Sequence, residues 1–148
     1  MESNCQQHGK PPSEIRSALL REMGMLGLPA EETNNIHFTV WEMAAFGWTL
    51  AEAEYNRLEG PNLMLCQVIL AADHKSHMRV LRKVPLQKTD PDVPAVTMWS
   101  LVDLADVDGD GRMEVVLEGY SYENQWLEVD SIYGQDAHTI FAGLGYYL

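Results

Sequence analysis

The sequence has few positively charged residues and no long apolar segment. Its 148 residues include 10 Lys and Arg against 22 Asp and Glu, so the formal net charge is −12. Because contact with phosphate groups or anionic lipids needs clustered Lys and Arg, we expect no nucleic-acid partner. No segment approaches the roughly 18 apolar residues of a membrane-spanning helix, and residues 1–12 lack the apolar core of a secretory signal peptide, which leaves the compartment open.

Cysteine and familiar catalytic motifs are also scarce. Cys5 lies in a polar stretch and Cys66 among apolar residues, so we expect two independent thiols and no disulfide framework. No Gly-x-Ser-x-Gly elbow, phosphate-binding loop or dinucleotide fingerprint is present. Asp103 and Glu118 invite comparison with an acid–base pair, but we expect them either to support neighbouring metal ligands or to face solvent. A hydrolase with its site in the N-terminal half, and calcium in a purely structural role, is the alternative function.

One acidic segment, residues 106–114 and called here the acidic loop, carries the strongest functional signal. Asp106, Asp108 and Asp110 alternate with small or neutral residues, and Glu114 follows. Two bare charges about 4 Å apart repel by roughly 1 kcal/mol in water and about 4 kcal/mol at an effective dielectric of 20. A hard divalent cation with oxygen ligands, usually calcium, removes that repulsion. We predict Ca²⁺ bound by these four side chains and by the backbone carbonyl of Arg112.

The spacing separates this loop from an EF-hand. Positions one, three and five fit, and Gly111 occupies the sharp turn, but position twelve is Leu117 instead of glutamate. Residues 114–117 are rich in β-branched side chains, which favours a strand. A calcium loop that enters a strand resembles the FG-GAP/VCBS calcium-binding repeat of β-propeller blades, whose pattern is Asp-x-Asp-x-Asp-Gly-x-x-Asp, with Glu114 in the last place. The open alternative is an acidic hairpin turn without metal.

The resemblance covers residues 99–148, about a third of the chain. It implies a blade-like β unit that binds calcium, in a family that is commonly secreted or displayed at the cell surface. Four strands are expected there, over 96–104, 114–122, 126–133 and 138–146. Their aromatic residues should fill the core or pair across strands, and a carbohydrate- or peptide-stacking surface is the alternative: Trp99, Tyr120, Tyr122, Trp126, Tyr133 and Phe141.

The N-terminal part reads as a helix followed by strands. Residues 1–12 are polar and predict a disordered tail. Residues 13–26 show helical spacing of apolar side chains, with Ser13 as N-cap, and predict a helix that covers a sheet or binds a partner. Residues 36–46 are ambiguous, because their first residues alternate as in a strand, which we expect there, while residues 42–45 favour a helix. Thr49 and Glu52 form a capping box that predicts a helix start. A helix–turn–helix over 40–58 would be too acidic to face phosphate.

A hairpin is expected next, with strands over 63–72 and 78–85. His74 and His77 near its turn suggest a zinc pair, but a zinc site needs further ligands, so exposed turn histidines are expected. Residues 87–94 predict a loop or boundary. The whole is an α+β, mostly antiparallel domain over 13–148, with a helix-and-strand part over 13–95 and a calcium-binding unit over 96–148. We expect a monomeric, calcium-dependent structural or interaction module, with a protein or carbohydrate as a further partner.

Overall fold

A computed structural model describes residues 5–43, 46–75, 77–133, 137–143 and 146–147. The chain is mostly antiparallel β structure in two sheets with little helix, as the sequence predicts. It divides into two compact units, Met1–Pro91 and Asp92–Leu148. The division falls within the segment 87–94 that the sequence indicates as a loop or boundary. Within the described residues, no helix is long and apolar enough to cross a membrane.

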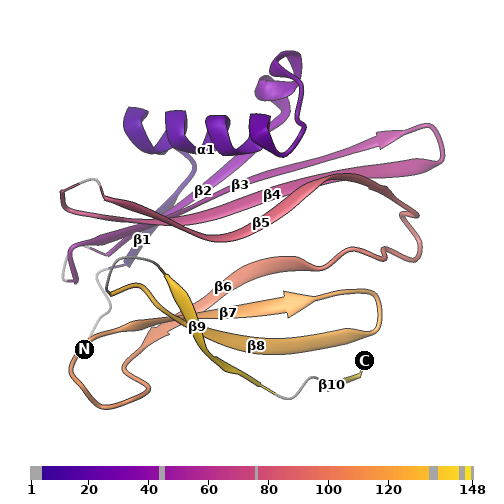
Figure 1. Ribbon diagram of the computed structural model, residues 1–148. Coiled ribbons are helices and arrows are strands. Elements are labelled where there is room, and N and C mark those ends of the chain that lie inside the picture. The colour runs from indigo at the N-terminus through magenta and orange to yellow at the C-terminus, as the bar shows by residue number, and fades with distance from the viewer. Residues whose placement is uncertain (1–4, 44–45, 76, 134–136, 144–145, 148) are drawn as a thin grey trace. The chain divides into compact units, whose positions relative to one another are not determined.

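The first unit is a five-stranded antiparallel sheet with one α-helix on it and a short 3-10 helix, η1 (Ala30–Asn35), that follows this α-helix in the sequence (Figure 1). The strands follow one another in the order of the sequence, and the hairpin between the third and fourth turns at Gly60, whose φ is 61°. The expected strands over 63–72 and 78–85 are confirmed as parts of longer ones. The strands are β1 (Cys5–His8), β2 (His37–Met43), β3 (Trp48–Glu59), β4 (Asn62–Asp73) and β5 (Met78–Thr89).

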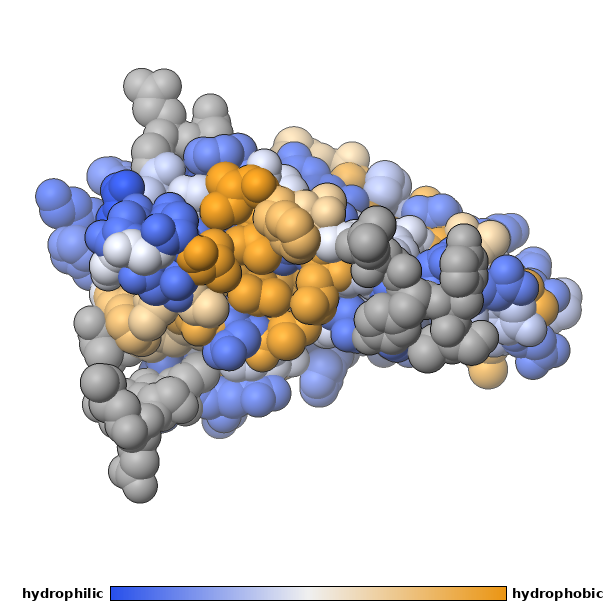
Figure 2. All heavy atoms as spheres, turned by 90° about the horizontal axis from the view of Figure 1, so that it is seen from below, coloured by the Kyte–Doolittle hydropathy of each residue, from blue (hydrophilic) through white to orange (hydrophobic). Residues whose placement is uncertain are grey.

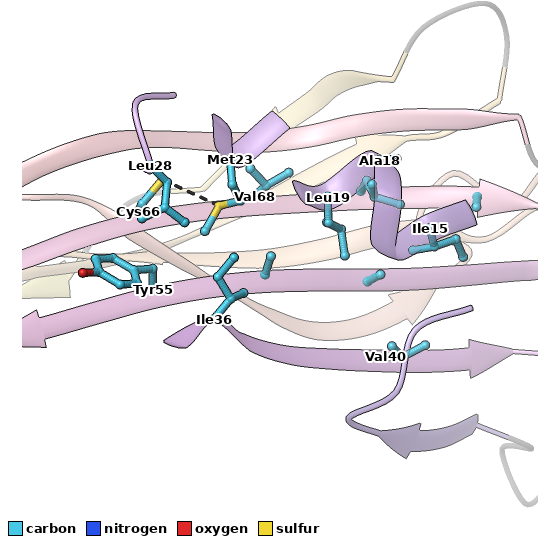
Figure 3. Packing of buried hydrophobic residues seen from close by; sticks show 14 residues of the cluster. Ile15, Ala18, Leu19, Met23, Leu28, Ile36, Val40, Tyr55, Cys66 and Val68 are labelled. Atoms are coloured by element: carbon cyan, nitrogen blue, oxygen red, sulfur yellow. Dashed lines mark hydrogen bonds between the residues drawn. The ribbon is translucent and has the colours of Figure 1, made fainter. Parts of the chain in front are cut away.

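Helix α1 (Ser13–Met25) covers one face of this sheet, which confirms the predicted helix and its role as a cover (Figures 1 and 3). Its buried side chains are Ile15, Ala18, Leu19 and Met23. Ala51 and Ala53 of β3 are fully buried in the same cluster, and their small side chains let the helix approach the central strands closely. The helix starts one residue earlier than an N-cap at Ser13 would place it, because Pro12 is the N-cap. The helix ends before Gly27, whose φ angle is 104°.

Two expectations for the first unit are wrong. Residues 5–8 lie in the strand β1, where the sequence suggests a disordered tail, because their backbone pairs with Val40 to Met43 of β2. The capping box at Thr49 and Glu52 starts no helix, since both residues lie inside β3, which pairs with β2 on one side and β4 on the other. Two ladders of backbone hydrogen bonds outweigh a local helix preference. The helix–turn–helix alternative over 40–58 fails for the same reason.

The second unit is a smaller antiparallel sheet. It consists of β6 (Met98–Ala105), β7 (Glu114–Tyr120), β8 (Asn124–Ser131), β9 (His138–Ala142) and β10 (Tyr146–Tyr147). The first three form a meander, and both β9 and β10 pair with β8 along its length. All four expected strands are therefore present, the last as two short pieces. Residues 144–145 between them lie outside the described residues.

A glycine in β7 allows two tryptophans to meet across this sheet. Gly119 pairs with Trp99 on one side and with Trp126 on the other, and the two indole rings contact edge to face at a centroid distance of 5.7 Å. A Cβ atom on Gly119 would lie 2.6 Å from Trp126 and 2.9 Å from Trp99. The absence of a side chain at position 119 therefore makes room for the pair, which has the cross-strand role expected for these aromatic residues.

Apolar side chains also reach the surface, and Figure 2 shows apolar residues gathered on one face. In the second unit, exposed large apolar side chains include Val102 on β6, Leu127 on β8, and Ile140 and Phe141 on β9. Phe141 is 57% exposed and Leu127 39% exposed. These residues are available for contact with a partner.

Candidate metal centre

The acidic loop connects β6 to β7. Ala105 and Glu114 are the last paired residues of the two strands, so the loop closes a hairpin and continues into a strand, as the sequence predicts. Gly109 and Gly111 adopt φ angles of 76° and 84°, a region that side chains other than glycine's rarely tolerate. Leu117, at the position of the EF-hand glutamate, is fully buried in β7 and takes no part in the loop.

Aspartate side chains hold the backbone of the loop in place. Asp106 Oδ1 accepts hydrogen bonds from the backbone N–H groups of Gly109 at 2.8 Å and Asp110 at 3.1 Å, and its Oδ2 accepts one from Gly111 at 2.8 Å. Asp108 Oδ1 accepts another from Asp110 at 3.1 Å. These bonds fold the chain around the carboxylates, so that the loop is ordered by the same side chains that the sequence selects as ligands.

The four predicted acidic residues converge on one point. Asp106, Asp108, Asp110 and Glu114 each offer a carboxylate oxygen, and these oxygens all lie within 4.8 Å of one another. Within the part of the chain that the structure describes, this is the only group of three or more His, Cys, Asp or Glu residues that could hold a metal ion. The loop therefore forms an acidic cluster with the donor atoms that a hard cation prefers.

Glu114 differs from the three aspartates because it is buried. Its side chain is 2% exposed, whereas the aspartates face solvent. Burial raises the pKa of Glu114, and the nearby charge of Asp108 raises it further. Its Oε2 atom has no hydrogen-bond partner among the described residues. A buried carboxylate oxygen that lacks a partner is costly, and a cation in the cluster would remove that cost.

Arg112 and Tyr133 complete the surroundings of the cluster. The Arg112 backbone N–H donates to Asp110 Oδ1 at 2.8 Å, and this bond, assisted by the guanidinium group, lowers the pKa of Asp110. The guanidinium carbon lies 4.8 Å from the centre of the Tyr133 ring. The Tyr133 hydroxyl accepts a hydrogen bond from the Met113 backbone at 3.2 Å. That the carbonyl of Arg112 is a ligand stays a prediction. The sequence gives no signal for the contact with Tyr133, which follows Met113 by twenty residues.

The other residues that the sequence selects do not form a site. His77 Nδ1 lies 3.4 Å from Asp73 Oδ2, an ion pair at the start of a turn, and no third metal ligand joins them within the described residues. Asp103 is exposed, and its Oδ1 accepts a hydrogen bond from the backbone of Leu104. Asp103 therefore faces solvent, one of the two placements expected for it, whereas Glu118 on β7 is half-buried.

The first unit contains a cavity that sequence reasoning missed. Its volume is about 310 Å³, and Tyr55, Arg57 and Met64 line it together with Pro29, Glu32, Glu59 and Leu86. Arg57 and Glu32 form an ion pair at 2.6 Å. A hydrogen bond from Asn35 lowers the pKa of Glu32, while burial raises the pKa of Tyr55. Since these shifts move both groups away from neutral pH, neither is suited to general acid–base work there.

Glu52 is another buried acid, and the sequence did not indicate its burial. It is 8% exposed on β3, and Gln67 Nε2 donates a hydrogen bond to its Oε1 at 3.3 Å. Burial raises the pKa of Glu52 to about 7, and the carboxylate of Glu54 raises it in the same direction. Alternation along β3 places Glu52 on the face opposite to Tyr55, so Glu52 and the cavity lie on opposite sides of the sheet.

Comparison with known proteins gives no match: no family model, no curated protein and no solved structure matches this chain.

Proposed function

We propose that this chain is a calcium-binding β module, in which the cation fastens the β6–β7 hairpin and so supports a structural or protein-interaction role. The observation that carries the proposal is Glu114, a buried carboxylate with one oxygen lacking a hydrogen-bond partner among the described residues and with three aspartates beside it. Exposed aspartates alone can be hydrated by water. A buried glutamate turned towards them is hard to explain without a positive charge at the centre.

The donor atoms favour calcium over other metals. The cluster offers oxygen atoms only, whereas zinc and copper sites use the nitrogen and sulfur atoms of His and Cys. Calcium accepts six to eight oxygen ligands in flexible geometry, while magnesium requires a nearly ideal octahedron and retains several waters. Four carboxylates and the Arg112 carbonyl suit the larger ion. The loop's continuation into a strand agrees with the resemblance to FG-GAP/VCBS repeats, which bind calcium in this way.

Support for the interaction role comes from the same unit. Leu127, Ile140 and Phe141 expose apolar side chains on β8 and β9, two strands of the sheet whose β6–β7 hairpin carries the acidic loop (Figure 1). Phe141 pairs with Val129, two residues after Leu127, so Leu127 and Phe141 lie on one face of the sheet, where exposed apolar groups can mark a protein-binding surface. We propose a protein as the partner, with calcium fixing the hairpin in a conformation that can bind it.

The test compares the wild type with Asp108→Ala in two measurements. Calorimetry measures the heat of calcium binding, and thermal unfolding measures the stability with and without calcium. At a free calcium level a hundredfold above the dissociation constant, binding stabilises the fold by about 2.7 kcal/mol. Asp108→Ala should lose nearly all of this stabilisation. Asp103→Ala, which removes an exposed aspartate of the same hairpin outside the cluster, should keep it. A wild type that gives no calcium heat and no response to chelator would overturn the proposal.

The alternative of a hydrolase in the N-terminal half has one observation in its favour, the neutral pKa of Glu52. A carboxyl that titrates near pH 7 is suited to donate a proton in catalysis. However, the cavity of this unit lies on the other face of the sheet, and its own groups are shifted away from neutrality. We therefore prefer the calcium module. Loss of hydrolytic activity in Glu52→Gln would favour the alternative.

A further inference from the structure

The guanidinium group of Arg112 occupies a carboxylate that a bound cation would need. Arg112 Nε donates a hydrogen bond to Asp110 Oδ2 at 3.1 Å, while its backbone N–H donates to Asp110 Oδ1 at 2.8 Å. Both oxygens of Asp110 are thus engaged by one residue. Of the four acidic residues in the cluster, Asp110 is the one that the structure pairs with a positively charged side chain.

A cation in the cluster and this guanidinium group would repel each other. Asp110 contributes to a set of oxygens confined within 4.8 Å, so a cation at their centre would lie only a few Å from a guanidinium held at Asp110 Oδ2. The repulsion is twice as strong for a doubly charged ion as for a singly charged one. Binding therefore requires the Arg112 side chain to give up Asp110 and move away.

The guanidinium group contacts the Tyr133 ring at the same time as it contacts Asp110. Its carbon lies 4.8 Å from the centre of the Tyr133 ring, within the range of cation–π attraction. The Arg112 side chain is 60% exposed, so it can turn without displacing packed neighbours. Tyr133 also accepts the hydrogen bond from Met113 in the loop, which holds the ring beside the cluster.

We propose that Arg112 is an intramolecular competitor for the cation: its guanidinium group neutralises Asp110 while the cluster is empty and releases Asp110 when calcium binds. This inference rests on the proposed function. It makes Arg112 a regulator of affinity, because part of the binding free energy of the cation is spent on breaking the contact with Asp110. This contact also lowers the repulsion between Asp110 and the other carboxylates of the empty cluster.

The experiment compares calcium titrations of the wild type, Arg112→Gln and Arg112→Lys by calorimetry. Arg112→Gln keeps the backbone amide and removes the charge, so its dissociation constant should fall roughly 5- to 10-fold, given typical energies of exposed ion pairs and the lost repulsion. Arg112→Lys, which keeps the charge and loses the planar group, should stay within about threefold of the wild type. Arg21→Gln, an exposed arginine on α1 with the same change of charge, should leave the constant unchanged.

A second measurement follows the side chain itself. The Nε–H resonance of Arg112, assigned by its loss in Arg112→Gln, should shift during the titration as its hydrogen bond to Asp110 breaks. A dissociation constant in Arg112→Gln equal to or higher than that of the wild type, or an Nε–H resonance that does not move while calcium binds, overturns this inference and leaves the proposed function standing. A wild type that binds no calcium overturns both.

Discussion

One oxygen atom, Oε2 of Glu114, distinguishes the acidic loop from an ordinary acidic turn. Asp106, Asp108 and Asp110 are exposed and organise the loop through hydrogen bonds with its backbone, which an acidic turn without metal could also do. Glu114 is buried beside them and its Oε2 accepts no hydrogen bond from the described residues. A fold that buries an acid next to three others loses stability unless a cation compensates.

The burial of Glu114 beside three aspartates predicts opposite effects of Glu114→Gln with and without calcium. In chelator, the variant should be more stable than the wild type by about 1 kcal/mol or more, because a buried charge and its repulsion from Asp108 are removed. In calcium, the variant should be less stable than the wild type, since a ligand is lost. Denaturant unfolding in both conditions measures the crossover. A variant that is destabilised equally in both would show that Glu114 only packs.

Glu52 should make the stability of the fold depend on pH. Its pKa is about 7 in the folded chain, because of burial and then of Glu54, and near 4.5 when unfolded. Between these values the folded state binds more protons than the unfolded state, so the free energy of unfolding falls as pH rises from about 4.5 to about 7. The loss is up to about 3 kcal/mol. The lowered pKa values of Glu32, Asp73 and Asp110 act at lower pH, where they destabilise the fold on acidification.

Urea unfolding in chelator from pH 5 to pH 8 measures this slope. Glu52→Gln should flatten it, because the glutamine cannot lose a proton. Glu59→Gln, an exposed residue at the end of the same strand, should keep the slope of the wild type. Equal slopes in the wild type and in Glu52→Gln would assign the pH dependence to other groups.

At the scale of elements, the sequence predicts what depends on nearby residues and misses what depends on distant ones. The helix over 13–26 and the hairpin of β4 and β5 follow from apolar periodicity and turn residues. The acidic loop is contiguous, so its spacing alone brings four acidic side chains together. In β3, by contrast, a local capping box at Thr49 and Glu52 points to a helix, and only pairing with β2 and β4 makes it a strand. Tyr133 and the ion pair of Glu32 with Arg57 depend on the same kind of distant contact.

Two methionines of α1 test whether the helix is held by its buried face. Met23 is fully buried, and its sulfur lies 3.6 Å from Cys66 Sγ on β4 (Figure 3). Met25, two residues on, is 65% exposed. Met23→Ala should lower the free energy of unfolding by roughly 2–4 kcal/mol through lost burial and a cavity. Met25→Ala should change it by less than about 0.5 kcal/mol. Similar losses for both would mean that the helix does not pack as described.

The chain as a whole consists of two compact units with different properties. The first carries the helix, the larger sheet and the buried core cluster, while the second carries the acidic loop and the exposed apolar side chains of β8 and β9. The sequence indicates this division through the segment 87–94. The sequence does not show which apolar side chains of this unit are exposed, because the exposure of Leu127 or Phe141 depends on how the strands of the sheet pair.

Two opposing effects determine whether copies of the chain associate. Exposed apolar side chains favour association, and a net charge of −12 opposes it. One bound calcium ion removes only two of these charges, so repulsion between copies persists when the site is filled. We therefore predict a monomer in calcium, and light scattering at about 0.15 M salt should report 16.7 kDa.

The same measurement at about 1 M salt, where surface charges are screened, separates the two forces. A mass that rises there and returns to 16.7 kDa in Phe141→Asp would show that the apolar face can bind another copy but is held apart by charge. A stable assembly of four or more copies at low salt would contradict the monomer and would favour a ring of blades, as in the propellers that the calcium loop resembles.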